Sequence, residues 1–205
     1  HLSLRRQRQM CIRDRYMGET IPEEQLPLKV VGVSPCFRRE VGSHGQSDLG
    51  IWRVHQFTKV EQIVIAKPED SWELHEELLQ NCIDLWNELG LHYEVVNICT
   101  GDMGTVAARK YDIEAWLPGA AQYKEVVSCS NCTDYQANRL QIKYGQPGHS
   151  NQPIVHTLNS TAVATSRALV AIMEQNQLAD GSVRIPEVLI PLMGGQATLE
   201  PCNWG

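Results

Sequence analysis

The 205-residue sequence has no apolar run approaching the ~20 residues that a helix needs to span a bilayer. This absence argues against an integral membrane protein, and we expect no membrane partner. The sequence also has no internal repeat, low-complexity tract or Ser/Gly linker, so a single domain is the simplest expectation. A composition of 42% hydrophobic and 20% charged residues is typical of a globular fold.

Basic residues are few outside the first 15 positions. Residues 1–15 contain five arginines and one aspartate, and since the whole chain has a formal charge of −6, the rest of it carries −10. A fold with that charge does not hold nucleic acid through a broad basic surface, so any RNA contact must be local. Residues 1–15 also lack the apolar segment of a secretory signal. We interpret them as an unrelated or disordered start rather than as a nucleic-acid arm or a localisation signal.

The seven cysteines do not form the pattern of a disulfide-stabilised protein, because their number is odd and their spacing irregular. Cys129 and Cys132 form one CxxC pair, and a structural zinc ion needs more ligands than such a pair supplies. We therefore expect two reduced cysteines near a strand end, with no metal. A reducing compartment fits this usage, so the sequence predicts a cytoplasmic protein, with an organellar copy as the open alternative.

The first half of the chain predicts a β-hairpin. Residues 28–37 are rich in β-branched side chains and predict a strand, and residues 51–65 form a second long β-like run. Between them, residues 41–50 contain three glycines and several small polar residues, which is typical of a loop. We expect the two strands to pair antiparallel, with residues 41–50 as the tip.

Helices and further strands follow the hairpin. Apolar residues at helical spacing predict a helix that starts at Asp70, with Asp70 and Glu73 as the N-cap and its partner, and that ends at Gly90. We expect two more strands and a second helix, over residues 93–99, 111–116 and 162–175. Strands in hairpin-like order with segregated helices indicate an α+β fold with an antiparallel sheet.

Polar side chains occupy alternate positions of both hairpin strands. Arg38 and Glu40 are two residues apart at the end of the first strand, and Phe57, Lys59 and Glu61 repeat that period on the second. Since alternate residues of a strand project from the same face, these side chains should form a polar floor. Considered alone, this pattern is better explained by a solvated face with cross-strand ion pairs.

Two more clusters favour a ligand site over a solvated face. Glu125 and Ser128 offer hard oxygen atoms of the kind that hold Mg²⁺ together with substrate phosphates. Asn159 and Thr161 precede Arg167, which we expect in the first turns of the second helix. Free N–H groups at a helix N-terminus attract anions, and an arginine there strengthens a phosphate site. Each of these signals is weak on its own.

Three long segments, in the correct order, resemble the class II seryl-tRNA synthetases. Motif 2 and its loop are similar to residues 34–62, SPCFRREVGSHGQSDLGIWRVHQFTKVEQ. The metal-binding strand and the helix after it resemble residues 125–144, EVVSCSNCTDYQANRLQIKY. Motif 3 and the end of the catalytic domain resemble HTLNSTAVATSRALVAIMEQNQ and then DGSVRIPEVLIPLMGG. We therefore divide the chain into an unrelated start (1–15), a partial catalytic domain with motifs 2 and 3 (16–195) and a tail (196–205).

The resemblance implies a class II antiparallel β-sheet, flanked by helices, that binds ATP in a bent conformation with Mg²⁺. It also implies a ligase: L-serine is activated to seryl-adenylate, and the seryl group passes to the 3′ end of tRNA(Ser), with tRNA(Sec) as an open further acceptor. Attack of a carboxylate on a phosphate brings two anions together, so arginines and Mg²⁺ placed around the α-phosphate suit this reaction.

The same resemblance implies roles for single residues. Arg38 would bind the α-phosphate and the serine carboxylate, and Arg167 would cover one face of the adenine and reach the γ-phosphate, which makes these two the catalytic candidates. Phe57 would stack on the other face of the adenine, and Glu61 would hold the serine ammonium. The ATP-binding set is Arg38, Arg39, Glu40, Val54, His55, Gln56, Phe57, Glu125, Val126, Val127, Ser128 and Arg167. The serine-binding set is Arg38, Glu61, Asn159 and Thr161, and the metal ligands are Glu125 and Ser128.

Upstream parts of the family have no counterpart in this sequence. Motif 1, which builds the homodimer interface, the Thr-x-Glu loop over serine and the helical arm that grips tRNA are all missing, so we expect a C-terminal piece of a synthetase. The loop over residues 41–50 would face the tRNA acceptor end, and since it has no lysine or arginine it would position the RNA rather than attract it.

Two other interpretations of these residues stay open. One is a relative that activates an amino acid and loads a carrier protein, which a test of acceptors would separate from the tRNA enzyme. The other is a non-catalytic remnant that acts as an interaction module. Intact Arg38, Glu125 and Arg167 count against that remnant.

Overall fold

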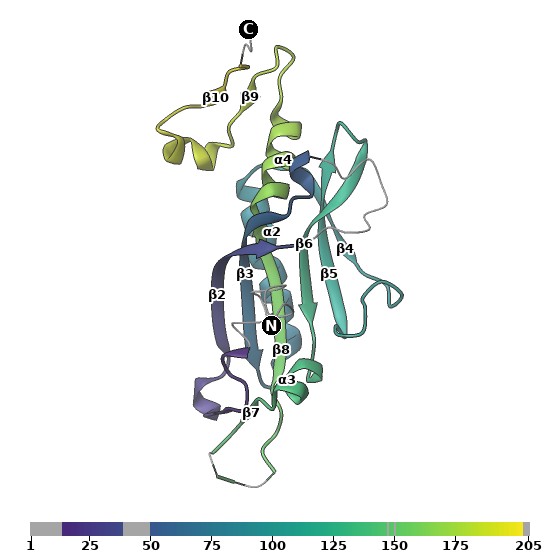
Figure 1. Cartoon of the computed structure of the whole chain (residues 1–205), viewed down its shortest axis with the longest axis vertical. Coiled ribbons are helices and arrows are strands. Elements are labelled where there is room, and N and C mark those ends of the chain that lie inside the picture. The colour runs from purple at the N-terminus through teal and green to yellow at the C-terminus, as the bar shows by residue number, and fades with distance from the viewer. Residues whose placement is uncertain (1–13, 39–49, 147, 150, 203–205) are drawn as a thin grey trace.

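A six-stranded antiparallel β-sheet forms the centre of the chain in its computed structural model, which describes residues 14–38, 50–146, 148–149 and 151–202 (Figure 1). The strand order is β2-β3-β8-β6-β5-β4. These strands are β2 (Leu28–Phe37), β3 (Gln56–Ala66), β4 (Tyr93–Asn97), β5 (Arg109–Leu117), β6 (Gln122–Asn131) and β8 (His156–Ala164). Helices flank the sheet, so the expected α+β fold is confirmed.

The first two strands form the expected hairpin. β2 and β3 pair antiparallel along the whole of β2. β3 starts later than the run expected over 51–65, because Gly50–Trp52 (η4) form a 3-10 turn before it. Most of the expected tip falls on residues 39–49, which lie outside the described part of the chain.

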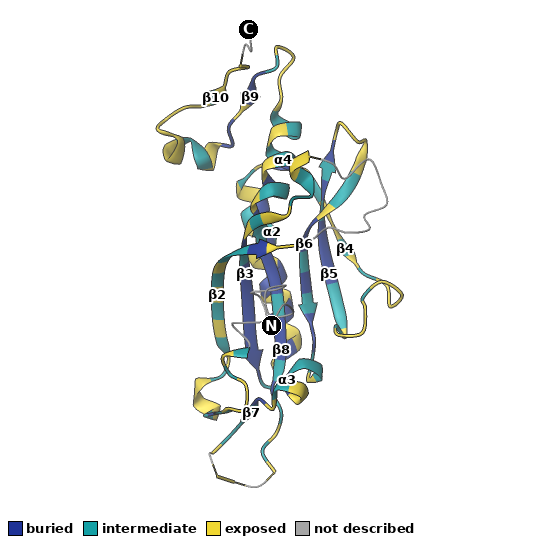
Figure 2. Cartoon of the chain, viewed as in Figure 1, coloured by how far each residue is buried: buried dark blue, intermediate teal, exposed yellow. Residues whose placement is uncertain are grey.

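Helix α2 (Ser71–Glu88) packs on one face of the sheet and builds the main core. Figure 2 shows the buried residues gathered along the central strands and on the side of α2 that faces them. Gly90, with φ of +66°, follows the helix end as expected, since a left-handed backbone suits glycine. The buried apolar residues of α2 recur at helical spacing and include Leu74, Leu78, Cys82 and Trp86.

The start of α2 differs from the expected capping box. Asp70 is the N-cap residue and Glu73 lies in the first turn, as expected, but Asp70 has helical backbone angles (φ −87°, ψ −15°) and its side chain makes no capping hydrogen bond, so the side-chain bond of the predicted box is not formed. Ser71 Oγ instead donates to the Pro68 carbonyl at 3.0 Å and lies 2.8 Å from His156 Nδ1 on β8. The helix start is therefore tied to the sheet through the contact of Ser71 with His156.

The second helix, α4 (Thr165–Asn176), begins later than the expected residue 162. The preceding residues belong to β8, where Val163 lies opposite Val60 of β3 instead of on a helix face. Cross-strand pairing therefore outweighs the apolar spacing that suggested an earlier start. Arg167 still lies in the first turn of α4, as expected.

The remaining expected strands match β4 and β5, although each differs from its predicted bounds by a few residues. Within the segment expected to be a tail, β10 pairs antiparallel with β9.

In the described ranges, no helix is long and apolar enough to cross a membrane. The described cysteines are free thiols: Cys36, Cys82, Cys99, Cys129, Cys132 and Cys202. The smaller elements are β1 (Thr20–Ile21), η2 (Glu23–Gln25), α3 (Tyr135–Leu140), β7 (Lys143–Tyr144), β9 (Val183–Arg184), η5 (Glu187–Met193) and β10 (Thr198–Leu199).

Candidate active site

A cleft lies at the place where strands β6 and β8 separate. The two strands pair only over residues 129–131 and 158–160, and beyond them β8 continues along β3 while β6 continues along β5. Side chains of both halves of the sheet, of η4 and of α4 line this cleft: Arg38, Trp52, Arg53, Val54, Phe57, Lys59, Glu125, Val126, Thr161, Ala164, Ser166 and Arg167. Because its charged lining is mostly basic, the cleft suits an anionic ligand.

A bulge brings two predicted metal ligands to one face of the sheet. Glu125 and Ser128 are separated by two residues, which would place them on opposite faces of a regular strand. The register of β5 and β6 shifts between Ile113 and Glu114, so that Glu125 lies opposite Glu114 and Ser128 lies opposite Asp112. The extra residue on β6 therefore turns both side chains to the same face.

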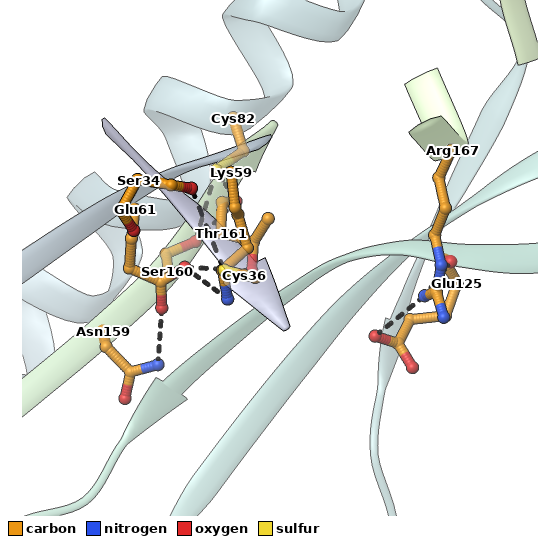
Figure 3. A network of polar contacts seen from close by, with 10 residues as sticks. All are labelled: Ser34, Cys36, Lys59, Glu61, Cys82, Glu125, Asn159, Ser160, Thr161 and Arg167. Atoms are coloured by element: carbon orange, nitrogen blue, oxygen red, sulfur yellow. Dashed lines mark hydrogen bonds and ion pairs between the residues drawn. The ribbon is translucent and has the colours of Figure 1, made fainter. Parts of the chain in front are cut away.

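The carboxylate of Glu61 is the centre of a buried polar cluster (Figure 3). Asn159 Nδ2 donates to Oε1 at 3.1 Å, Thr161 Oγ1 donates to Oε2 at 3.1 Å, and Lys59 Nζ lies 3.0 Å from Oε2. The antiparallel pairing of β3 with β8 places Thr161 opposite Glu61. Glu61 is only 3% exposed and Lys59 only 6% exposed, so each charge needs the other to offset its loss of water.

Arg167 forms a second group of contacts, which lies apart from the Glu61 cluster in Figure 3. Its Nη1 donates to the backbone carbonyl of Glu125 at 2.7 Å and lies 3.6 Å from Oε1 of the same residue. Its guanidinium carbon is 5.2 Å from the ring centroid of Trp52, and Lys124 Nζ is 5.5 Å from that ring. Cation–π attraction therefore helps to orient Arg167 toward the cleft.

Arg38 and Phe57 are neighbours at the loop end of the hairpin, where β2 ends and β3 begins. The Arg38 guanidinium carbon lies 5.5 Å from the centroid of the Phe57 ring, and the Arg38 backbone N–H donates to the His55 carbonyl at 2.9 Å. An aromatic ring beside a charged guanidinium can stack on a base while the arginine pairs with a phosphate.

Asp112 adds a carboxylate beside the predicted metal ligands. Its Oδ2 lies 3.0 Å from Lys110 Nζ, whereas its buried Oδ1 has no hydrogen-bond partner among the described residues. Burial raises the pKa of Asp112, the nearby Glu125 raises it further, and Lys110 opposes the shift. An unpartnered buried carboxylate oxygen opposite Ser128 fits a cation that prefers oxygen ligands.

The protein alone supplies an incomplete set of metal ligands. The described ranges hold no group of three or more His, Cys, Asp or Glu side chains placed to bind a metal ion. Mg²⁺ is usually held by one or two carboxylates together with substrate phosphates. The residues at Glu125, Ser128 and Asp112 therefore fit Mg²⁺ that arrives with a nucleotide.

Seven of the fifteen predicted ligand residues line this cleft. Glu61 does not line it, but Glu61 accepts from Thr161 and pairs with Lys59, which do. Asn159 does not line it either and is joined to the cleft through its hydrogen bond to Glu61. The predicted residues that line it are Arg38, Val54, Phe57, Glu125, Val126, Thr161 and Arg167.

Other predicted residues lie elsewhere or cannot be placed. His55 and Gln56 are exposed beside the cleft, and Val127 packs in the core. Val127 is only 1% exposed as a whole residue and does not line the cleft. Arg39 and Glu40 lie outside the described residues.

Sequence reasoning left several residues of the site out of the predicted ligand sets, including Lys59, Ala164 and Ser166 of the cleft lining. Trp52 and Arg53 line the cleft, and Asp112 lies opposite Ser128. Trp52 and Arg53 stand immediately before the VHQF segment, so they could have been included with it. Asp112 alternates with the charged Lys110 and Glu114 along β5, a pattern that points to a polar sheet face.

Comparisons with known proteins agree with these motifs. A family model described as the tRNA synthetase class II core domain (G, H, P, S and T) matches residues 4–176. The serine–tRNA ligase of Methanocella arvoryzae is 62% identical over 181 residues, which are 88% of this chain and 43% of that protein. The serine–tRNA ligase of Archaeoglobus fulgidus is 58% identical over 175 residues, which are 85% of this chain and 39% of that protein. The chain thus spans less than half the length of these relatives.

Solved structures show the same relationship. The seryl-tRNA synthetase of Pyrococcus horikoshii complexed with ATP superposes with a TM-score of 0.90 at 53% identity, covering 94% of this chain and 43% of that one. The cytoplasmic serine–tRNA ligase of Naegleria fowleri in complex with AMP superposes with a TM-score of 0.88 at 47% identity, covering 94% of this chain and 46% of that one. The expected class II fold is therefore confirmed. This chain belongs to the class II tRNA synthetases, and within them its sequence and fold group it with the seryl-tRNA synthetases.

Proposed function

We propose that this chain carries the adenylate-forming site of a serine–tRNA ligase, which activates L-serine with ATP and passes the seryl group to tRNA(Ser). The observation that carries this proposal is the buried Glu61 cluster next to a basic cleft. The Glu61 cluster offers a carboxylate with amide and hydroxyl partners, which suits a small polar amino acid. The basic cleft offers arginines and aromatic rings, which suit a nucleotide.

The serine end of the site would use Glu61, Asn159, Thr161 and Arg38. Glu61 accepts from the ligand's ammonium, Asn159 and Thr161 pair with its hydroxyl, and Arg38 binds its carboxylate. A site built to hydrogen-bond a hydroxyl leaves buried polar groups unpaired when alanine or glycine enters, which can give a discrimination of ~10⁴ or more.

The ATP end would use Arg38, Phe57, Arg167 and the bulged end of β6. Phe57 stacks on the adenine, Arg167 covers its other face and reaches the γ-phosphate, and Arg38 binds the α-phosphate. The Pyrococcus horikoshii seryl-tRNA synthetase was solved in complex with ATP, which supports a nucleotide at this site. Arg39, Glu40, His55 and Gln56 would complete the motif 2 part of the site.

The reaction needs no covalent intermediate with the protein. A serine carboxylate oxygen attacks the α-phosphorus, a new P–O bond forms, and the bond to the β-phosphate oxygen breaks as pyrophosphate leaves. The terminal ribose of tRNA then takes the seryl group and AMP departs. Arg38 and Arg167 hold the two anions together and stabilise the charge that develops on the phosphates.

Mg²⁺ would be held by Glu125 and Ser128, with Asp112 as a third oxygen donor. When bound, it would neutralise phosphate charge. The contact between Arg167 and Glu125 already places a cationic group beside this carboxylate, so the site balances both signs of charge.

The partners of the whole enzyme are further parts of the proposal. We infer the tRNA(Ser) acceptor end as the RNA partner, a homodimer built through motif 1 and a cytoplasmic location, and tRNA(Sec) stays an open further acceptor. The free thiols of the described cysteines support a reducing compartment.

Serine-dependent exchange of pyrophosphate into ATP tests this function. The 205-residue chain should bind ATP weakly and exchange with serine well below the rate of a full-length serine–tRNA ligase, but it should still prefer serine to alanine, and Arg38→Ala should abolish the exchange. Lys29→Ala is a matched control, because Lys29 pairs with Glu77 on the surface away from the cleft. Transfer to a carrier protein instead of tRNA(Ser) would favour the alternative ligase, and no exchange by the wild-type chain would contradict the proposal.

A further inference from the structure

Lys59 is a buried cation at the boundary between the cleft and the Glu61 cluster. It lines the cleft, is only 6% exposed, and has its Nζ 3.0 Å from Glu61 Oε2. Lysine is almost never fully buried unless it is paired. The proposed function uses Glu61 as the acceptor for the substrate ammonium but gives Lys59 no task.

The contacts of Glu61 leave room for one more donor. A carboxylate offers about four lone-pair sites. Among the described residues, Lys59 and Thr161 share Oε2, whereas Oε1 accepts only from Asn159. A ligand ammonium can therefore bind at Oε1 without displacing Lys59.

Removing the lysine charge would leave Glu61 as a buried carboxylate without a counter-ion. An uncompensated buried charge is very costly, so Glu61 would move away or pair with another cation instead of presenting Oε1 to a ligand. The side chain at position 59 therefore controls whether its neighbour can recognise a cationic ligand.

We infer that Lys59 is a positioning residue for amino-acid specificity: its ammonium holds Glu61 oriented, so that Oε1 selects ligands with an α-ammonium group. This inference rests on the proposed function and deepens it. It predicts that Lys59 acts on one part of the ligand, the amino group, and leaves recognition of the nucleotide unchanged.

The test compares two probes by isothermal titration on the full 205-residue chain. One probe is a non-hydrolysable seryl-adenylate analogue, and the other is the same molecule without the α-amino group. Because a hydrogen bond to a charged group is worth more than a neutral one, the wild-type chain should prefer the amino form by about tenfold or more. Lys59→Met should lose most of this preference, and Lys59→Arg should keep it.

Lys29→Met is the matched control, because it removes a lysine from an exposed ion pair on β2 and should leave the preference unchanged. If Lys59→Met does not fold, Lys59→Gln replaces it with a neutral polar side chain and the same expectation. If Lys59→Met weakens the binding of both probes equally, Lys59 has a purely structural role and the inference is overturned. If Lys59→Met binds the amino form more tightly than the wild-type chain does, the inference is also overturned, since Lys59 would then compete with the ligand ammonium.

The two probes also separate this inference from the proposed function. A wild-type chain that binds neither probe, or that shows no preference for the amino form, would contradict the proposed function and the role of Lys59 with it. A wild-type preference that survives in the neutral variants would contradict the role of Lys59 alone.

Discussion

Arg167 owes its orientation to contacts from three elements. It lies in the first turn of α4, donates to the Glu125 carbonyl on β6, and stacks against Trp52 of η4. An arginine side chain loses several rotamers when it binds a phosphate, so contacts that restrict it beforehand favour binding. The ring of Trp52 is therefore part of the proposed nucleotide site, although Trp52 was not among the predicted ligand residues.

Replacement of Trp52 by leucine should weaken ATP binding. Loss of a cation–π contact worth about 0.5–2 kcal/mol corresponds to a few-fold to about thirtyfold lower affinity. Titration with ATP measures the change, and Trp52→Phe should retain part of the affinity. Trp72→Leu is the matched control, because Trp72 is an exposed tryptophan of α2. Equal ATP affinities of Trp52→Leu and the wild-type chain would contradict this role.

Residue types in the motifs were enough to predict the polar centre of the site. Glu61, Asn159 and Thr161 meet as expected, and Arg38 lies beside Phe57. The pairing of Lys59 with Glu61 could not be predicted, because residues at alternate positions of a strand share a face without having to touch. The structure adds that contact and the unpartnered oxygen of Asp112.

At the scale of elements, helix α2 stabilises the sheet that carries the site. Leu78 is buried in the core that α2 forms with the sheet, and Gln62 of β3 donates to its backbone carbonyl at 3.3 Å. Leu78→Ala should lower the free energy of unfolding by about 2–5 kcal/mol, because it removes buried atoms and leaves a cavity. Urea unfolding measures this loss. Leu169→Ala is the control, since Leu169 is 48% exposed on α4, and a similar loss in both variants would contradict the account of the core.

The same helix should make stability depend on pH. His75 of α2 is fully buried; its Nε2 lies 3.2 Å from the Cys129 carbonyl, and its Nδ1 has no partner among the described residues. Burial lowers the pKa of His75 below the ordinary 6.5, and the hydrogen bond to Cys129 opposes this shift. The unfolded chain therefore binds the proton more readily than the folded chain.

Stability from this histidine should be fully present above pH 6.5 and should decrease as the pH falls below that value. The slope is at most about 1.4 kcal/mol per pH unit for one group. Unfolding curves between pH 5 and pH 8 measure it, and His75→Phe should reduce the slope. Burial also lowers the pKa of His156, so part of the dependence should remain. An unchanged slope in His75→Phe would assign the effect to other groups.

Element boundaries show where sequence patterns stop being informative. The hairpin of β2 and β3 could be predicted because both strands have long β-branched runs. The start of α4 could not, since residues 162–164 carry helical apolar spacing, but Val163 and Ala164 pair with β3 and Ala162 is the extra residue of a bulge on β8. The two register shifts, beside Glu61 and beside Glu114, have no glycine or proline to mark them, yet they set which side chains share a face.

At the scale of the whole molecule, the cleft exists because two halves of one sheet diverge. β2, β3 and β8 carry the proposed serine end, and β6 with β5 carries the proposed metal end. The short pairing of β6 with β8 joins the halves below the cleft. Ligand contacts to both halves should therefore stabilise the fold as one unit, which gives thermal unfolding a direct link to binding.

The central claim is that this cleft is a seryl-adenylate site, and thermal unfolding of the 205-residue chain with a non-hydrolysable seryl-adenylate analogue tests it most directly. At ligand concentrations of about 100 times Kd, binding should stabilise the chain by about 2.7 kcal/mol and raise Tm. The alanyl analogue at the same concentration should raise Tm far less, since it leaves Asn159 and Thr161 without the ligand hydroxyl. Equal shifts with both analogues, or no shift with either, would contradict the account.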